Sequence, residues 1–108
     1  MITRITKFQV KPELSAEFES FVRQFKDELM STEGCRHFDI LKDKENNKQL
    51  FMFMIWQEDD FLDQFRQSDL NKILVSKLNH FSEKEPSSWT VETVFDPSEI
   101  NQQKSFFE

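Results

Sequence analysis

One uninterrupted apolar run stands out in the pattern of hydrophobic and polar positions along the chain. Residues 50–56 read Leu-Phe-Met-Phe-Met-Ile-Trp and lie between two polar stretches. Seven residues suit a β-strand and are too few to cross a membrane. A strand with one face in water would alternate apolar and polar residues, because successive side chains point to opposite faces. We therefore expect both faces of this strand to be covered, one by the chain's own helices and the other by a second sheet, a partner subunit or a ligand.

Three shorter segments predict the remaining strands. Residues 2–10 form the first, although Arg4 and Thr6 interrupt its apolar face. Residues 35–42 form the second, and the short polar turn that follows them predicts a hairpin with the apolar run. Residues 89–95 alternate between apolar and polar side chains, which indicates the last strand.

Apolar residues at three- and four-residue spacings predict the helices. The pattern over residues 14–30 predicts one amphipathic helix, and Gly34 follows it where a left-handed C-cap would be needed. A short helix is predicted around residues 61–65. Ser68 then provides a fresh N-cap for a longer helix over residues 70–81.

The predicted order of elements is β-α-β-β-α-β, which is the ferredoxin-like arrangement of an α+β domain: a four-stranded antiparallel sheet with its helices on one face. Residues 1–95 make up this domain, and residues 96–108 form a tail that resembles the start of a short helix. The helices cover one face of the sheet only. We therefore expect the bare face to pack on the same face of a second copy, which gives a homodimer.

Composition and charge exclude several classes of function. The chain has 108 residues, with 14 Lys and Arg against 20 Asp and Glu, and a net charge of −6. This charge repels nucleic acid and provides no basic face for an anionic membrane surface. The single cysteine, Cys35, forms no intrachain disulfide, and the first residues lack a signal-peptide pattern, so we expect a cytoplasmic protein. Two histidines and one cysteine in no ligand spacing predict no metal site.

The motif around Gly34 resembles that of a known family. Residues 34–41, a polar turn and an apolar strand that ends in Trp56 before acidic residues resemble the antibiotic biosynthesis monooxygenase (ABM) family, and the start of the chain at 2–12 is similar as well. The resemblance covers residues 1–95. It implies a dimeric α+β barrel, in which two ferredoxin-like subunits pack sheet to sheet. It also implies a monooxygenase that acts on an aromatic phenol or quinol without metal, flavin or other cofactor, because a deprotonated phenol can pass an electron to dioxygen.

The sequence departs from the family's pattern at positions that carry its chemistry. Family members often have a glutamate two residues before the tryptophan, where this chain has Met54, and histidines where this chain has Phe65 and Leu70. The asparagine that haem-degrading relatives carry on the first strand is missing from residues 5–8, which disfavours haem degradation. An alternative function therefore stays open: a non-catalytic dimeric module that binds a small hydrophobic molecule or a protein partner.

The candidate catalytic residues are His37 and Asp39, which are two positions apart on one strand and so share a face. A carboxylate beside an imidazole holds the tautomer and raises the basicity of the ring, which is what a general base requires. A solvent-facing pair at a strand edge, or a pair within the dimer interface, explains the same spacing.

Four residues are candidates for substrate binding. Trp56 matches a tryptophan that can line the cavity in family members, although a large core side chain at a strand end is the favoured interpretation. Met54, together with Met52, could line an adaptable hydrophobic pocket, although ordinary core packing is the favoured interpretation, and Phe65 is a further candidate. Asn71, together with Arg66, could donate hydrogen bonds to a substrate oxygen, and a solvated helix face explains both as well.

Overall fold

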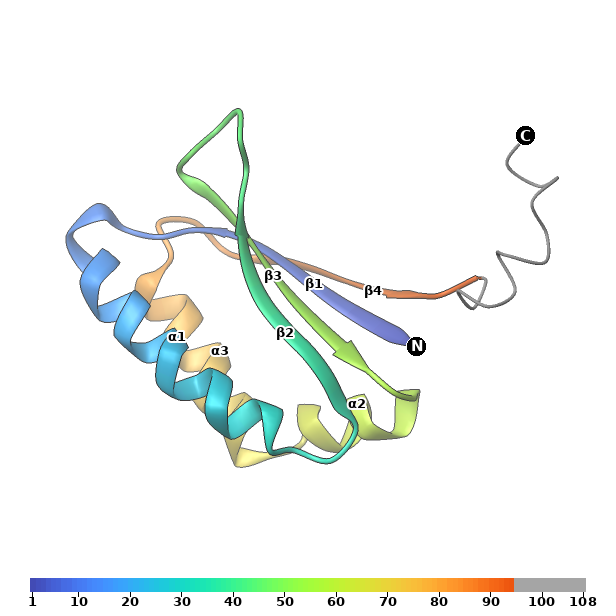
Figure 1. Ribbon diagram of the computed structural model, residues 1–108. Coiled ribbons are helices and arrows are strands. Elements are labelled where there is room, and N and C mark those ends of the chain that lie inside the picture. The colour runs from blue at the N-terminus through green and yellow to red at the C-terminus, as the bar shows by residue number, and fades with distance from the viewer. Residues whose placement is uncertain (95–108) are drawn as a thin grey trace, which may run out of the picture.

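The computed structural model describes residues 1–94, and it confirms the predicted order of elements (Figure 1). The predicted tail at 96–108 lies outside the described residues. The elements are β1 (Ile2–Gln9), the 3₁₀ turn η1 (Pro12–Leu14), α1 (Ser15–Met30), β2 (Cys35–Lys42), β3 (Gln49–Trp56), α2 (Asp59–Arg66), α3 (Asp69–Phe81) and β4 (Ser87–Glu92).

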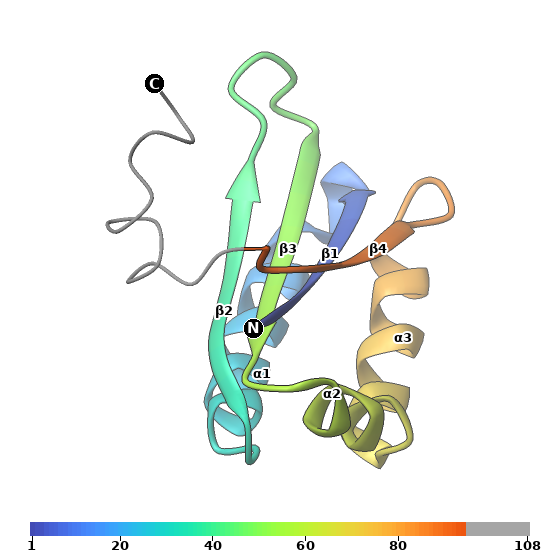
Figure 2. The same ribbon diagram turned by 90° about the vertical axis from the view of Figure 1, so that its right-hand side faces the viewer.

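The strands form one antiparallel sheet in the order β2-β3-β1-β4. All three helices lie on the same side of this sheet (Figure 1), and Figure 2 views it from the opposite, open side. In that view α1 lies behind β2, and α3 lies beside β4. This is the ferredoxin-like α+β fold that the pattern predicts. Among residues 1–94, no helix is long and apolar enough to cross a membrane.

Alternation along β3 divides the apolar run between the two faces of the sheet. Met52, Met54 and Trp56 point to the helices and are buried, as the prediction of a covered face requires. Their neighbours Phe51 and Phe53 point to the open face and are half-buried within the single chain. The core between the sheet and the helices is rich in phenylalanine, and the rings of Phe8, Phe18 and Phe81 pack edge to face with centroids 5.6 Å apart for each adjacent pair.

The open face of the sheet is largely apolar across all four strands. Residues directly opposite each other on adjacent strands share a face, so the register identifies its members. The apolar residues of this open face are Ile5, Leu41, Phe51, Phe53, Ile55, Trp89 and Val91. Leu41, Trp89 and Val91 are each close to half exposed in the single chain.

Two predicted boundaries need correction. The C-cap of α1 is Ser31, and Gly34 lies three residues later in the turn into β2. Its φ of +85° confirms the left-handed conformation, but the turn requires it and the helix end does not. The last strand ends at Glu92, short of the predicted end, because it pairs only with β1, whose first residue, Ile2, lies opposite Glu92. Phe95 lies outside the described residues.

Candidate functional site

A cavity of about 200 Å³ lies between the sheet and the helices α2 and α3. Its apolar wall consists of Met54, Leu62, Phe65, Leu74, Val75 and Leu78. Its polar wall consists of Arg4, Thr6, Arg66, Asn71 and Ser88. Larger hollows lie along α1: one of about 460 Å³ is lined in part by the exposed charged residues Glu17, Glu28 and Lys77, and one of about 440 Å³ is a mostly apolar surface hollow beside Phe18 and Ile40. The smaller cavity is the better candidate site, because most of its apolar wall is buried and its polar groups converge from four elements.

Arg4 enters the cavity from β1. The register places it between Met54 of β3 and Thr90 of β4, so its side chain is on the helix face of the sheet. Arg4 is half-buried, and its Nη1 donates a hydrogen bond to Thr90 Oγ1 at 2.9 Å. Burial lowers the pKa of its guanidinium, and the neighbouring charge of Arg66 lowers it further. Arg4 and Arg66 thus place two charges of the same sign in the lining of one cavity.

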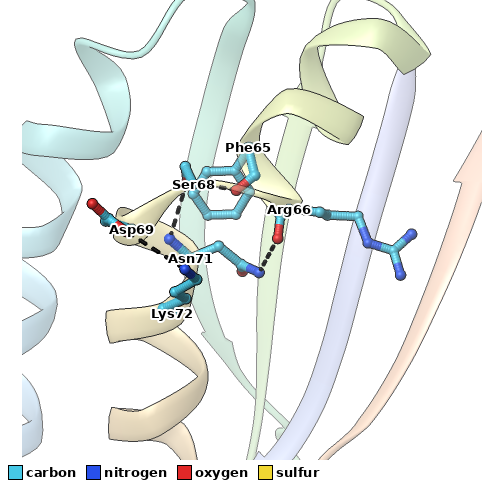
Figure 3. Close-up of polar contacts among 6 residues, drawn as sticks. All are labelled: Phe65, Arg66, Ser68, Asp69, Asn71 and Lys72. Atoms are coloured by element: carbon cyan, nitrogen blue, oxygen red, sulfur yellow. Dashed lines mark hydrogen bonds and ion pairs between the residues drawn. The ribbon is translucent and has the colours of Figure 1, made fainter.

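Hydrogen bonds at the corner between α2 and α3 hold the next two polar groups (Figure 3). Ser68 caps α3, since its Oγ accepts a hydrogen bond from the backbone N–H of Asn71 at 3.2 Å. The side-chain amide of Asn71 donates to the carbonyl oxygen of Arg66 at 3.0 Å. In Figure 3 the Arg66 side chain extends from this corner towards β1 and β4. The corner therefore places an amide and a guanidinium beside the cavity.

Two hydroxyl groups line the cavity on the sheet side. Thr6 of β1 is buried, and its Oγ1 lies 2.9 Å from the Oγ of Ser88 on β4, at hydrogen-bond distance. The two strands are paired at these residues. A neighbouring hollow of about 260 Å³ shares this wall and is lined on its far side by Asn79, Glu85 and Pro86.

Three of the four predicted substrate-binding residues line this cavity together: Met54, Phe65 and Asn71. The fourth, Trp56, is fully buried and is not part of the cavity wall. Its ring packs against Phe65 with centroids 5.1 Å apart, so it supports the aromatic wall from behind. Its indole Nε1 is buried without a protein partner among the described residues. The substrate-binding role of all four stays a prediction.

His37 and Asp39 lie together on β2, but on the open face of the sheet. His37 Nε2 and Asp39 Oδ2 are 3.8 Å apart, and both side chains are about half exposed. The register places them opposite Ile55 and Phe53, on the face away from the helices. The sheet therefore separates this pair from the cavity, and its catalytic role stays a prediction.

The sequence pattern also contains a signal for two cavity residues that were not singled out as candidates. Arg4 and Thr6 interrupt an otherwise apolar strand face at alternate positions, and both line the cavity. Among residues 1–94, no group of three or more His, Cys, Asp or Glu side chains is arranged to hold a metal ion.

The fold and the cavity together define a ferredoxin-like α+β domain with a small, partly aromatic site between its helices and its sheet. The family model described as antibiotic biosynthesis monooxygenase matches residues 1–73. The chain belongs to this ABM family, as the resemblance around Gly34 and Trp56 predicts.

Solved structures with the same fold include a conserved protein from Methanosarcina mazei, which is 29% identical with a TM-score of 0.78, over 85% of this chain and 91% of that chain. A structure described as an antibiotic biosynthesis monooxygenase is 17% identical, with a TM-score of 0.75, over 88% of this chain and 100% of that one. A variant of SnoaB from Streptomyces nogalater, described as a cofactor-independent oxygenase, is 14% identical with a TM-score of 0.76, over 89% and 95% of the two chains. Among curated proteins, none matched the chain.

Proposed function

We propose that this protein is a cofactor-independent monooxygenase that acts on a small aromatic phenol or quinol. Membership of the ABM family supports an oxygenase, and SnoaB of the same fold is described as a cofactor-independent oxygenase. The observation that carries the proposal is the cavity itself, in which an apolar wall with Phe65 and Met54 faces the donors Arg4 and Asn71. This combination suits a flat aromatic ring with an oxygen at one edge.

The chemistry follows from stabilising the phenolate. A guanidinium at the cavity wall favours the ionised form of a bound phenol, and a partly dehydrated site strengthens this attraction. The described wall contains no imidazole or carboxylate, so the proton passes to water at the exposed Arg66 side. The phenolate then passes one electron to dioxygen, and the two radicals combine to a peroxide at a ring carbon.

Conversion of the peroxide to product needs no external reductant when the keto tautomer of the phenol has a CH₂ carbon. Loss of water from the protonated peroxide leaves a carbonyl on that carbon. One oxygen atom of dioxygen stays in the product and the other leaves as water with the two hydrogens of the CH₂ group. The substrate supplies all four electrons, and the protein supplies position and charge.

The size of the cavity limits the substrate. Pockets that hold drug-sized ligands measure roughly 300–1,000 Å³, and this cavity measures about 200 Å³. One or two fused rings are therefore the substrate class that we propose.

We also propose that the protein works as a homodimer that pairs through the open face. The family resemblance implies a dimeric barrel, and the face presents apolar residues on all four strands, among them Phe53 and Trp89. A contiguous apolar face of this kind is unusual on a monomer. Dimerisation would bring His37 and Asp39 to the margin of the interface, where the contact between their side chains serves assembly as readily as catalysis.

Oxygen uptake tests the proposed activity. The purified protein should oxidise 1,4-dihydroxynaphthalene, or two-ring phenols whose keto tautomer has a CH₂ carbon, at least about tenfold faster than buffer alone does. Ser88→Phe fills the cavity from the edge strand and should abolish the acceleration. Ser76→Phe adds the same ring at an exposed position of α3, outside the cavity and away from the open face, and should keep it. No acceleration by the parent protein across phenols and quinols would contradict the proposal.

The alternative of a non-catalytic binding module has one observation in its favour. The described cavity wall lacks a titratable proton acceptor, which a ligand-binding site does not need. An aromatic phenol that binds in the cavity without any oxygen uptake would support this alternative over the monooxygenase.

A further inference from the structure

We propose that the cavity selects an aromatic ring that carries a carboxylate next to its phenol hydroxyl, so that the substrate class is a one- or two-ring aromatic hydroxycarboxylate. The inference deepens the proposed function, because it assigns the substrate of the same cavity. It rests on Arg4 and Arg66, which reach one cavity from different elements.

Two arginines bring positive charge to the cavity wall. Arg4 comes from β1 and Arg66 from the last residue of α2, and both line the cavity. Within residues 1–94 neither forms an ion pair with a carboxylate. Arg23, in contrast, pairs with Glu19 at 2.7 Å. Two guanidinium groups that no described carboxylate neutralises at one site are notable in a chain whose acidic residues outnumber its basic ones by 20 to 14.

Two positive charges at one site favour an anionic ligand. A guanidinium stays protonated in proteins, so the pair keeps two positive charges that repel each other. The lowered pKa of Arg4, which burial and then Arg66 produce, points in the same direction. A bound phenolate offsets one of the two charges. A carboxylate on the neighbouring ring carbon offsets the second and presents two acceptor oxygens, which suit the planar fork of donors on arginine.

The apolar wall of the cavity favours a hydrocarbon body for the ligand. Phe65, Met54 and Leu74 form an apolar wall that is almost completely buried, and inorganic anions cannot use it. A flat hydrocarbon body with its charge at one edge matches both walls at once. The net negative charge of the protein disfavours anions in general, so a preference for the carboxylate has to come from the local pair of arginines.

A matched pair of ligands tests the inference by isothermal titration calorimetry. 1-Hydroxy-2-naphthoate and 1-hydroxy-2-naphthamide have nearly the same shape and differ in the charge of one group. The parent protein should bind the carboxylate about 10- to 100-fold more tightly than the amide, the range expected for added charge-assisted hydrogen bonds. Inorganic phosphate should bind at least about tenfold more weakly than the naphthoate, because it lacks the apolar body.

Variants locate the preference. Arg4→Gln and Arg66→Gln should each reduce the ratio of the two affinities to below about threefold, whereas Arg4→Lys and Arg66→Lys should restore part of it. Arg36→Gln removes the same charge from an exposed residue of β2 outside the cavity and should leave the ratio unchanged. Equal binding of naphthoate and naphthamide by the parent, no binding of either at millimolar concentration, or equal binding of phosphate would overturn the inference. So would an equal loss in Arg36→Gln.

The result is separable from the proposed activity, because binding is measured without oxygen uptake. A charge preference that depends on Arg4 and Arg66 without oxidation keeps this inference and removes the monooxygenase. Oxidation of neutral quinols with no preference for the carboxylate does the reverse.

Discussion

At the scale of single residues, departures from the hydrophobic pattern mark the candidate site. Arg4 and Thr6 occupy positions of β1 that the alternation reserves for apolar side chains. Burial of polar groups is unfavourable unless they find partners, and here Thr90 and Ser88 of β4 provide them. The sequence shows the interruption but not the partners, since those come from a strand about 80 residues away. Positions that break a local pattern are where function is expected.

Gly34 tests the turn between α1 and β2. Its φ of +85° is strained for other residues, and a Cβ there would overlap the ring of Phe61. Gly34→Ala should therefore lower the free energy of unfolding by about 2–4 kcal/mol, as measured by urea denaturation. Glu33→Ala, at the exposed neighbouring position, should stay within about 0.5 kcal/mol of the parent. Equal effects of the two substitutions would contradict the steric account.

Cys35 gives a pH dependence with a definite sign. Burial raises the pKa of its thiol, and this outweighs the opposite, lowering effect of the hydrogen bond with the backbone of His37. The unfolded chain therefore ionises first as the pH rises. The free energy of unfolding should be unaffected by this group below about pH 8, and should fall as the pH passes the ordinary thiol pKa of roughly 8.5 towards the raised folded value.

The measurement is urea denaturation of the parent and of Cys35→Ala between pH 7 and 10. The fall in stability with pH should be steeper in the parent. Identical slopes would show that the thiol pKa is the same in the folded and unfolded chain.

At the scale of elements, periodicity predicts most of the fold. The three-to-four spacing over residues 14–30 predicts α1, and the alternation with its turns predicts the strands to within a few residues. The register at the start of β2, just before His37 and Asp39, is an exception. An irregularity between Cys35 and His37 shifts the register of β2, so that Cys35 and Phe38 share the helix face at an odd spacing. Nothing in the sequence marks this bulge, but alternation from Phe38 onward places His37 and Asp39 on the face opposite its ring.

Ser68 tests the division of the second helical segment. Its Oγ accepts the first hydrogen bond of α3 from the N–H of Asn71. Ser68→Ala should lower the free energy of unfolding by about 0.5–2 kcal/mol. Ser76→Ala, at an exposed position within α3, should have little effect and serves as the matched control. Thermal and urea denaturation of both variants provide the comparison, and a smaller loss for Ser68→Ala than for Ser76→Ala would refute the capping role.

At the scale of the whole molecule, residues 1–94 leave one apolar face of the sheet uncovered. The unbroken run in β3 predicts that both faces are buried, and the helices bury one of them. We propose that a second copy of the chain provides the other cover, which a single sequence cannot show. The site was predictable to a similar degree: Met54, Phe65 and Asn71 fall in one cavity, while the sheet separates His37 and Asp39 from it.

Sedimentation velocity tests the proposed homodimer. The parent should sediment as a dimer, since stable interfaces bury roughly 1,200–2,000 Å² and the open face spans four strands. Trp89→Lys introduces a charge at a half-exposed position of this face and should weaken dimerisation by at least about tenfold. Ile73→Lys, at a similarly exposed position of α3, should leave it unchanged. A monomeric parent at micromolar concentration would contradict the proposal.

The central claim is that an aromatic ligand binds between the helices and the sheet. Met54 lies in the wall of the cavity, Met52 is buried two residues earlier on the same strand, and Met30 is exposed on α1. A titration with 1-hydroxy-2-naphthoate, followed by NMR of ¹³C-methyl methionine, therefore observes the cavity and two internal controls at once. We expect the Met54 signal to shift to saturation while that of Met30 stays unchanged. A Met54 signal that stays unchanged while the ligand binds would contradict the account.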